Sequence, residues 1–302
     1  MLNLSGSIKK RTIYLVRKQA IGDVLWIEPV IKALATQYKR VIVLTRFPEL
    51  FENYPYKNVV FRSKISLLEK LLIKTEKRFG ISFFSINLNK SYEEKPLQHI
   101  LHAYQQKAGL PITNDLPALY LSENELQKDA AIKGKYVVLH IEERVVKKNT
   151  RRIYGIDWAA VAEYLNEKGY QVIEVGSGNS EIANIVYKPT KTIRELISTI
   201  NQASFFMGID SGPAHIAAAL HKPVILFFGS VNPDFRFFKE TLKGFILQHY
   251  CQFAGCYHTA KEPTTLTCRV VGEEGIPPCA DFSTQEVLLT IDKLIEQNKE
   301  AL

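Results

Sequence analysis

Short apolar runs alternate with amphipathic segments along most of the chain. The first half has strand-like apolar runs at 14–17, 41–45 and 81–88, and apolar positions with helical spacing at 24–38 and 97–108. A Ser-x-x-Glu pair at 122–125 has the spacing of a capping box and predicts another helix, which ends near residue 132. Strands that alternate with helices imply parallel sheets covered by helices on both faces, so the expected fold class is α/β.

A second series of the same kind begins near Tyr136. Its expected strands lie at 137–141, 171–175, 205–209 and 223–228. Its expected helices lie at 157–168, 192–200, 214–220 and 283–297. Two series of comparable length predict two Rossmann-like domains, residues 1–133 and residues 134–302. Ligands of such folds bind at the carboxyl ends of the strands, and a cleft between two facing domains is the expected site.

The chain is basic, with a formal net charge of +8, which predicts an acidic partner. One basic run contains Arg144, Lys147, Lys148, Arg151 and Arg152, and a second contains Lys64, Lys70, Lys74, Lys77 and Arg78. The second run shares its predicted helix with the apolar residues Ile65, Leu68, Leu71 and Leu72. Each run is either a solvated surface or a binding surface. The binding surface would contact a diphosphate in the first run and an anionic membrane in the second.

No segment approaches the roughly 20 apolar residues that span a bilayer. The first residues also lack the apolar core and cleavage site of a signal peptide. We therefore expect a cytoplasmic protein, with peripheral contact at the inner face of the membrane as a further option.

The segment 205–229 combines a buried strand, a polar loop, a small-residue helix and a second buried strand. Asp210, Ser211 and Gly212 form the loop, and a proline follows where a helix can begin. Backbone N–H groups at such a helix start favour a phosphate. In the alternative reading, Asp210 and Ser211 only cap the helix and His215 is a structural histidine.

The segment 13–34 has a related arrangement. A strand ends at Arg17, the chain turns at Gly22, and Asp23 opens a helix. Asp23 would then lie at the carboxyl edge of the first sheet, where active sites occur. A plain helix cap is the alternative for an aspartate in this position.

A glycine-containing turn, Gly176-Ser177-Gly178, follows the strand predicted at 171–175. The turn lacks the third glycine of a dinucleotide-binding fingerprint and is followed by the acidic Glu181. Gly176 and Ser177 would either contact a nucleotide base or ribose, or form an ordinary turn. An NAD(P)-dependent dehydrogenase is the alternative enzyme class that this turn keeps open.

All four cysteines of the chain, Cys251, Cys256, Cys268 and Cys279, fall within one short segment. In a reducing cytoplasm such a cluster favours metal binding over disulfides, and tetrahedral thiolate ligation suits zinc or iron. His258 could replace one ligand. A structural metal site, free thiols and disulfides all remain open at this point.

Two motifs together resemble signatures of glycosyltransferase family 9, the heptosyltransferases of lipopolysaccharide core synthesis and their relatives. The first is R-x4-G-D-x-L at 17–25, followed by P-x-x-x-A-L at 29–34. The second is D-S-G-x-x-H-x-A-A-A-L-x-K-P-V-x-x-x-F-G at 210–229. The helix after 156 is similar to the W-x-x-L helix of that family. The resemblance implies a GT-B fold, with two Rossmann-like domains that face each other across a cleft.

The resemblance also implies an inverting, metal-independent transfer from a nucleotide sugar, usually ADP-heptose, with no cofactor required for catalysis. The N-terminal domain would bind the acceptor, which is a hydroxyl of a glycan, a lipopolysaccharide core or a protein. The C-terminal domain would bind the donor, and nucleic acid is not an expected partner. A nucleotide-sugar-binding protein without catalysis is the alternative.

Site residues follow from the same resemblance. Asp23 matches the catalytic base of the family, with Arg17 and Gly22 beside it on the acceptor side. On the donor side, Ser211 and Gly212 would offer backbone N–H groups to the phosphates. The remaining donor-side matches are Asp210, His215 and Arg151. The cysteine cluster is similar to metal-bound cysteines of protein-directed members, although its spacing differs.

Overall fold

A computed structural model describes residues 10–64, 66–79, 85–94, 96–127, 132, 134–141, 151–178, 181–260, 266–272 and 275–299. The basic residues Arg144, Lys147 and Lys148, the start of the strand expected at 81–88, Ile65, and the side chains of Leu72 and Lys77 lie outside this description. The chain divides into two compact units. Unit 1 comprises residues 1–95 and 100–120, and unit 2 comprises residues 96–99 and 121–302.

The sheet of unit 1 is parallel and has the strand order β3-β2-β1-β4. Its strands are β1 (Lys10–Val16), β2 (Tyr38–Leu44), β3 (Val59–Arg62) and β4 (Ser85–Asn87). Val16 pairs with Leu44 on one side and with Asn87 on the other. The strands therefore end at one edge, and the residues that follow them lie side by side there.

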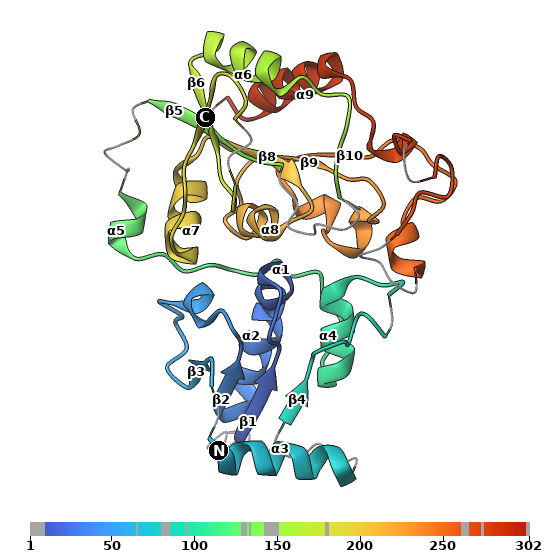
Figure 1. The fold of residues 1–302 in the computed structure, drawn as a ribbon. Coiled ribbons are helices and arrows are strands. Elements are labelled where there is room, and N and C mark those ends of the chain that lie inside the picture. The colour runs from blue at the N-terminus through green and yellow to red at the C-terminus, as the bar shows by residue number, and fades with distance from the viewer. Residues whose placement is uncertain are drawn as a thin grey trace, which may run out of the picture. The chain divides into compact units, whose positions relative to one another are not determined.

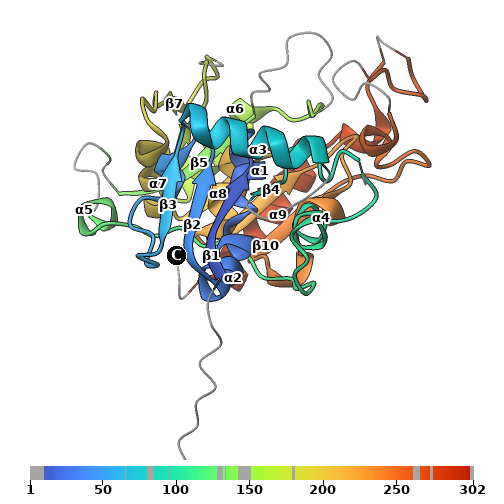
Figure 2. The same ribbon diagram turned by 90° about the horizontal axis from the view of Figure 1, so that it is seen from below.

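The helices of unit 1 are α1 (Ile21–Leu25), α2 (Glu28–Gln37), α3 (Leu67–Phe79) and α4 (Ile100–Ala108), with the short 3-10 helix η1 (Pro48–Phe51). The prediction of one helix over 24–38 is wrong, because the chain turns at Trp26 and Ile27 and a second helix begins. Pro29 explains the break, since proline lacks the N–H of a helix interior and suits the first turn of a new helix. Figure 2 shows α3 running across the strands of the sheet.

The sheet of unit 2 is parallel and has the order β10-β9-β8-β5-β6-β7. Its strands are β5 (Lys135–His140), β6 (Tyr170–Glu174), β7 (Ile185–Tyr187), β8 (Phe205–Ile209), β9 (Val224–Phe227) and β10 (Gly244–Leu247). The chain winds in one direction from β5 to β7 and in the other from β8 to β10. The order reverses between β5 and β8, and a reversal of this kind opens a crevice at the carboxyl ends where ligands bind.

The helices of unit 2 are α5 (Glu123–Leu126), α6 (Trp158–Glu167), α7 (Ile193–Gln202), α8 (Gly212–Ala219) and α9 (Thr284–Gln297). In Figure 1, α6 and α9 cover one face of the sheet, and α7 and α8 cover the other. The expected caps are confirmed: the side chains of Asp157, Thr192 and Ser283 accept N–H groups of the helices that they open. Helix α5 ends earlier than expected, because Gln127 is already extended.

The strand pattern of the sequence is confirmed for the long buried strands and misses β3, β7 and β10. These three strands have three or four residues each, and most of their side chains are only half-buried. Within the described ranges, no helix combines the length and the apolar content that crossing a membrane requires.

Candidate active site

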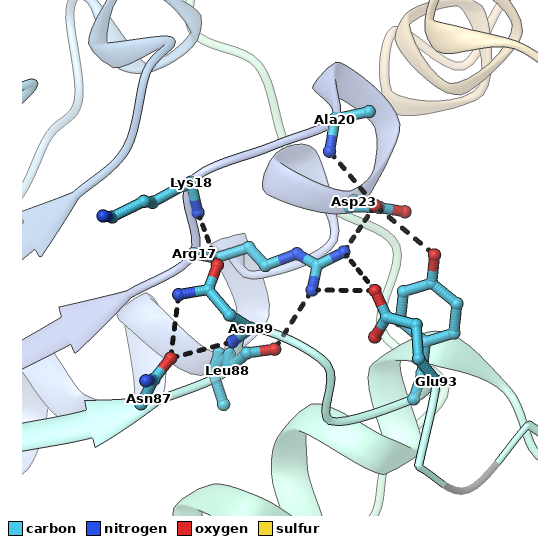
Figure 3. Close-up of polar contacts among 9 residues, drawn as sticks. Arg17, Lys18, Ala20, Asp23, Asn87, Leu88, Asn89 and Glu93 are labelled. Carbon is cyan, nitrogen blue, oxygen red and sulfur yellow. Dashed lines mark hydrogen bonds and ion pairs between the residues drawn. The ribbon is translucent and has the colours of Figure 1, made fainter. Parts of the chain in front are cut away.

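Arg17 is the first residue after β1, and only 2% of it is exposed. Its guanidinium donates to the carbonyl oxygen of Leu88 at 3.2 Å and to Oε1 of Glu93 at 3.3 and 3.4 Å. Its Nη2 atom also lies 2.5 Å from Oδ2 of Asp23 (Figure 3). A buried charge is tolerated only when paired and hydrogen-bonded, so these partners hold Arg17 in one place at the sheet edge.

Asp23 lies in the first turn of α1, and its side chain is 19% exposed. Besides Arg17, its Oδ2 atom accepts the backbone N–H of Ala20 at 3.1 Å and the hydroxyl of Tyr92 at 3.5 Å. Among the residues that the structure describes, none donates a hydrogen bond to Oδ1. Asp23 is the third residue of α1, and its carboxylate accepts the N–H of the cap residue Ala20. The same contacts also orient its carboxylate and leave one oxygen for another group.

The surroundings of this pair are aromatic. The guanidinium carbon of Arg17 lies 5.2 Å from the ring centre of Tyr92 and 5.5 Å from that of Tyr104. Burial by itself lowers the pKa of Arg17, but nearby Tyr104, Asp23 and Glu93 raise it above its ordinary value. Burial, reinforced by Asp23, holds the pKa of the Tyr104 hydroxyl far above its usual range. At neutral pH the site thus contains a charged guanidinium and a neutral phenol.

The structure brings Arg17 and Asp23 together and buries Gly22 in α1, where its carbonyl accepts the N–H of Trp26 at 3.1 Å. Sequence reasoning missed Tyr92 and Glu93, which complete the surroundings of Arg17. The available signal was their position a few residues after β4, at the same sheet edge as Arg17.

Asp210 follows β8 directly and is 3% exposed. Its carboxylate lies 3.4 Å from Nε2 of His215 and 3.5 Å from Nε of Arg151. Arg151 also donates to the backbone carbonyl of Asp210 at 3.0 Å. Burial alone would raise the pKa of Asp210, but Arg151, His215 and Arg236 hold it well below its ordinary value. Asp210 is therefore ionised at neutral pH, and it lies beside the reversal of the strand order.

Arg236 is the donor-side residue that sequence reasoning missed. It is 3% exposed, and its Nε atom lies 3.7 Å from Oδ2 of Asp210. The ring of Tyr257 lies within 6 Å of two guanidinium carbons, at 5.8 Å from that of Arg151 and at 5.9 Å from that of Arg236. Two guanidiniums against one carboxylate leave this cluster with a net positive charge. The only sequence signal was a cation nine residues after β9.

The loop after Asp210 opens α8. The Oγ atom of Ser211 accepts the N–H of Ala214 at 3.4 Å, and Gly212 is the first helical residue. The ring of His215 stacks on Phe237, with 4.5 Å between ring centres. The hydroxyl of Ser211 therefore caps the helix while the helix start adds to the positive field of the cluster.

Gly176 and Ser177 follow β6 at the same edge of this sheet, but two strands away from β8. The carbonyl of Gly176 accepts the hydroxyl of Tyr187 at 3.1 Å, and Ser177 is exposed. The structure thus brings Asp210, Ser211, Gly212, His215 and Arg151 together. Gly176 and Ser177 lie apart from this cluster, after the end of β6.

The four cysteines are free thiols and line one cavity of about 60 Å³. Burial and the other three thiols raise the pKa of Cys279 to about 12. The N–H of Phe253 donates to Sγ of Cys251 at 3.5 Å. Within the described ranges, no three His, Cys, Asp or Glu side chains are arranged so that they could hold a metal ion.

The comparison with protein families gives one match. The model of glycosyltransferase family 9 (heptosyltransferase) matches residues 70–252, which is more than half of the 302-residue chain. The chain belongs to glycosyltransferase family 9. The match includes Arg151 and the motif at 210–229, whereas Arg17 and Asp23 precede it.

Curated family 9 relatives are similar over part of their length. Autotransporter heptosyltransferase Aah of Escherichia coli is 27% identical over 203 residues, which cover 63% of this chain and 48% of Aah. Lipopolysaccharide heptosyltransferase 1 of Campylobacter coli is 36% identical over 81 residues, which cover 27% of this chain and 22% of that protein. The chain thus spans about half the length of Aah and less of the second relative.

Solved structures share the fold. The iron-containing dodecameric glycosyltransferase TibC from enterotoxigenic E. coli H10407 aligns with a TM-score of 0.72 at 17% identity, over 96% of this chain and 77% of TibC. The E. coli ADP-heptose lipopolysaccharide heptosyltransferase II aligns with a TM-score of 0.64 at 16% identity, over 95% of this chain and 99% of that one. The expected family and the α/β GT-B fold with two Rossmann-like parallel sheets are confirmed.

Proposed function

We propose that the protein is an inverting glycosyltransferase that moves a heptose from ADP-heptose to an acceptor hydroxyl. The observation that carries the proposal is the carboxylate of Asp23, because Arg17, Ala20 and Tyr92 hold one of its oxygens and leave the other for a substrate. Family membership supports the reaction class. TibC has been solved in complex with ADP-D-beta-D-heptose, which supports the choice of donor.

In the proposed reaction, Oδ1 of Asp23 takes the proton of the acceptor hydroxyl. The hydroxyl oxygen then attacks the anomeric carbon of the sugar as the bond to the diphosphate oxygen breaks. One such displacement inverts the anomeric configuration. A carboxylate serves as a general base when it is ionised and positioned within hydrogen-bond reach of the proton.

The leaving diphosphate gains negative charge as its bond to the sugar breaks. In our proposal, the N-terminus of α8 at Ser211 and Gly212 and the guanidinium of Arg151 stabilise this charge, and His215 and Arg236 support the cluster. The side chain of Arg151 is 30% exposed and so retains access to a ligand. These groups let the reaction proceed without a catalytic metal. Asp210 positions the cations rather than touching the phosphate.

The proposed acceptor is a hydroxyl of a glycan, a lipopolysaccharide core or a protein. The names of the relatives support both a protein acceptor and a lipopolysaccharide acceptor, since Aah is an autotransporter heptosyltransferase and others are lipopolysaccharide heptosyltransferases.

A thermal-unfolding screen of ADP, UDP, GDP and NAD tests the donor site. A ligand that binds only the folded state at a hundred times its Kd raises stability by about 2.7 kcal/mol, so ADP should give the largest rise in melting temperature. Arg151→Gln should reduce that rise. The exposed Lys293→Gln on α9 is the matched control, because no contact joins Lys293 to Asp210 within the described residues. A larger rise in melting temperature with UDP or GDP than with ADP would refute ADP-heptose as the donor. The largest rise with NAD would favour a dehydrogenase.

We also propose that the four cysteines hold a structural zinc or iron ion. Cys251, Cys256, Cys268 and Cys279 share one cavity, and Arg152 and Arg269 line it as well. Four thiolates carry more negative charge than one zinc or iron ion can neutralise. The two guanidiniums would balance part of the excess. The thiols would have to turn toward a common point to bind it. The ion would brace this segment and take no part in sugar transfer.

Metal analysis of protein purified without chelators should find about one zinc or iron ion per chain, because four thiolates form a complete tetrahedral site. The double variant Cys256→Ser/Cys268→Ser should lose the metal and unfold at a lower temperature. Ser230→Ala, which alters the same cavity without removing a thiol, should keep the metal. Less than a tenth of an ion per wild-type chain would refute the site and leave the cysteines as free thiols.

A further inference from the structure

Helix α3 presents leucines to solvent. Leu67, Leu68 and Leu71 are 83%, 74% and 63% exposed, which places them among the most exposed large hydrophobic residues of the described chain. Glu69 joins α3 to the sheet, because its carboxylate accepts hydrogen bonds from Tyr14 and Arg62, both at 3.0 Å. A surface helix ordinarily buries its apolar stripe against the core. In α3 the leucines at 67, 68 and 71 are instead turned outward.

Cations share this outward side. Lys70, Lys74 and Arg78 are exposed, and Lys74 and Arg78 lie seven residues after Leu67 and Leu71, which places them over the same face of the helix. No acidic residue belongs to this face among the described side chains. An exposed helix face that mixes leucine with lysine and arginine is the pattern of a helix that lies at a membrane interface.

A pocket of about 560 Å³ adjoins the start of α3. The apolar side chains of Val16 and Leu44 line it together with four cations, Lys18, Arg46, Lys64 and Lys70, and no carboxylate is among its described lining residues. Lys70 belongs both to the pocket and to the outward side of α3. The combination of aliphatic and cationic lining suits a phosphate that is attached to an apolar molecule.

This pocket is separate from the proposed catalytic base. Val16 ends β1 and lines the pocket, whereas neither Arg17 nor Asp23 is among its described lining residues. Figure 3 shows the side chain of Lys18 pointing away from the Arg17–Asp23 pair. The pocket therefore offers a phosphate site that does not use the Arg17–Asp23 pair.

We propose that unit 1 docks on an anionic membrane through α3, with Leu67, Leu68 and Leu71 in the interfacial layer and a lipid headgroup phosphate in the pocket. A second copy of the chain fits this face poorly, because two identical basic surfaces repel each other. A nucleic acid would leave the leucines without a partner, since single strands need aromatic side chains for stacking. An anionic bilayer satisfies both the leucines and the cations.

Co-sedimentation of the full chain with vesicles tests the proposal. One vesicle type is phosphatidylcholine alone, and the other is an equal mixture of phosphatidylcholine and phosphatidylglycerol. Wild type should bind the anionic vesicles more tightly, and salt should weaken that binding. Each lysine near an anionic surface contributes about fivefold in affinity, so Lys70→Gln/Lys74→Gln should bind about 25-fold more weakly. Leu67→Gln/Leu71→Gln should reduce binding to both vesicle types.

Two further variants locate the contact. Lys18→Gln/Arg46→Gln should lower the preference for anionic vesicles, because it removes pocket cations without changing α3. The matched control is Leu289→Gln/Lys293→Gln on α9, where an exposed leucine and lysine lie one turn apart, and it should bind as wild type does. Equal binding of wild type to the two vesicle types would overturn the proposal. So would leucine variants that change the oligomeric state but keep vesicle binding, since they would indicate a second copy.

Discussion

Replacing Asp23 with asparagine should abolish sugar transfer and leave donor binding nearly unchanged. Asparagine has the same shape and can still accept the N–H of Ala20, but its amide cannot take a proton from the acceptor. General-base catalysis contributes about a hundredfold to ten-thousandfold in rate, so a loss in that range is expected. The measurement is release of ADP and formation of glycosylated product, beside the melting-temperature shift with ADP.

Glu93→Gln is the matched control for Asp23→Asn. Glu93 also pairs with Arg17, so this variant removes one negative charge from the same guanidinium and keeps the proposed base. Its transfer rate should fall far less. Turnover of Asp23→Asn close to that of wild type would refute the role of Asp23. If wild type binds ADP but transfers no sugar to any acceptor tested, the non-catalytic binding protein becomes the better reading.

Replacing Asp210 with asparagine should destabilise unit 2 by about 3–5 kcal/mol. Breaking a buried ion pair leaves an uncompensated charge, and here both Arg151 and Arg236 lose their carboxylate. Affinity for the nucleotide should fall as well, because Arg151 loses its ion pair and keeps only its hydrogen bond to the backbone carbonyl of residue 210. Denaturant unfolding, followed by a probe in unit 2, measures the first effect.

The stability of wild type should also depend on Asp210 at acid pH. The pKa of Asp210 is lowered in the folded state, whereas an unfolded aspartate titrates near pH ~3.9. Its contribution is therefore fully present above that pH and is lost as the pH falls toward the folded pKa. Asp210→Asn should lack this part of the acid transition.

Asp234→Asn is the control for Asp210→Asn. Asp234 pairs with Lys239 at 2.8 Å, but both side chains are more than half exposed, and surface pairs contribute about 0–1 kcal/mol. Its unfolding should therefore match that of wild type within about 0.5 kcal/mol. An Asp210→Asn protein that unfolds at the same denaturant concentration as wild type would contradict the stabilising role of the buried ion pairs of Asp210.

Local sequence patterns predict many helices and strands of this chain, and the elements that they miss have identifiable physical reasons. The caps at Asp157, Thr192 and Ser283 could be predicted because a capping side chain bonds to N–H groups two or three residues away. The long strands of unit 2 could be predicted because strands buried on both faces are apolar throughout. Short edge strands such as β3 and β10 lack that signal, since half-buried positions accept polar and apolar residues alike.

The residues of the candidate site likewise comprise some that a local pattern predicts and others that it does not. Asp23 and Asp210 were identifiable because each follows a predicted strand and opens a predicted helix. Arg236 and Glu93 were not identifiable, because neither belongs to a local pattern. Arg17 meets Glu93 across 76 positions of the chain, and Arg151 meets the backbone of Asp210 across 59.

The sequence by itself determined the α/β class, the family and the two aspartates, because apolar periodicity, helix caps and short motifs involve neighbouring residues. Only the tertiary structure decided which cations face Asp210, which oxygen of Asp23 stays unbonded, and which way the leucines of α3 point. These features depend on contacts between distant segments. The direction of α3 shows this most plainly, because Glu69 contacts Tyr14 and Arg62 of the sheet while Leu67, Leu68 and Leu71 are left exposed.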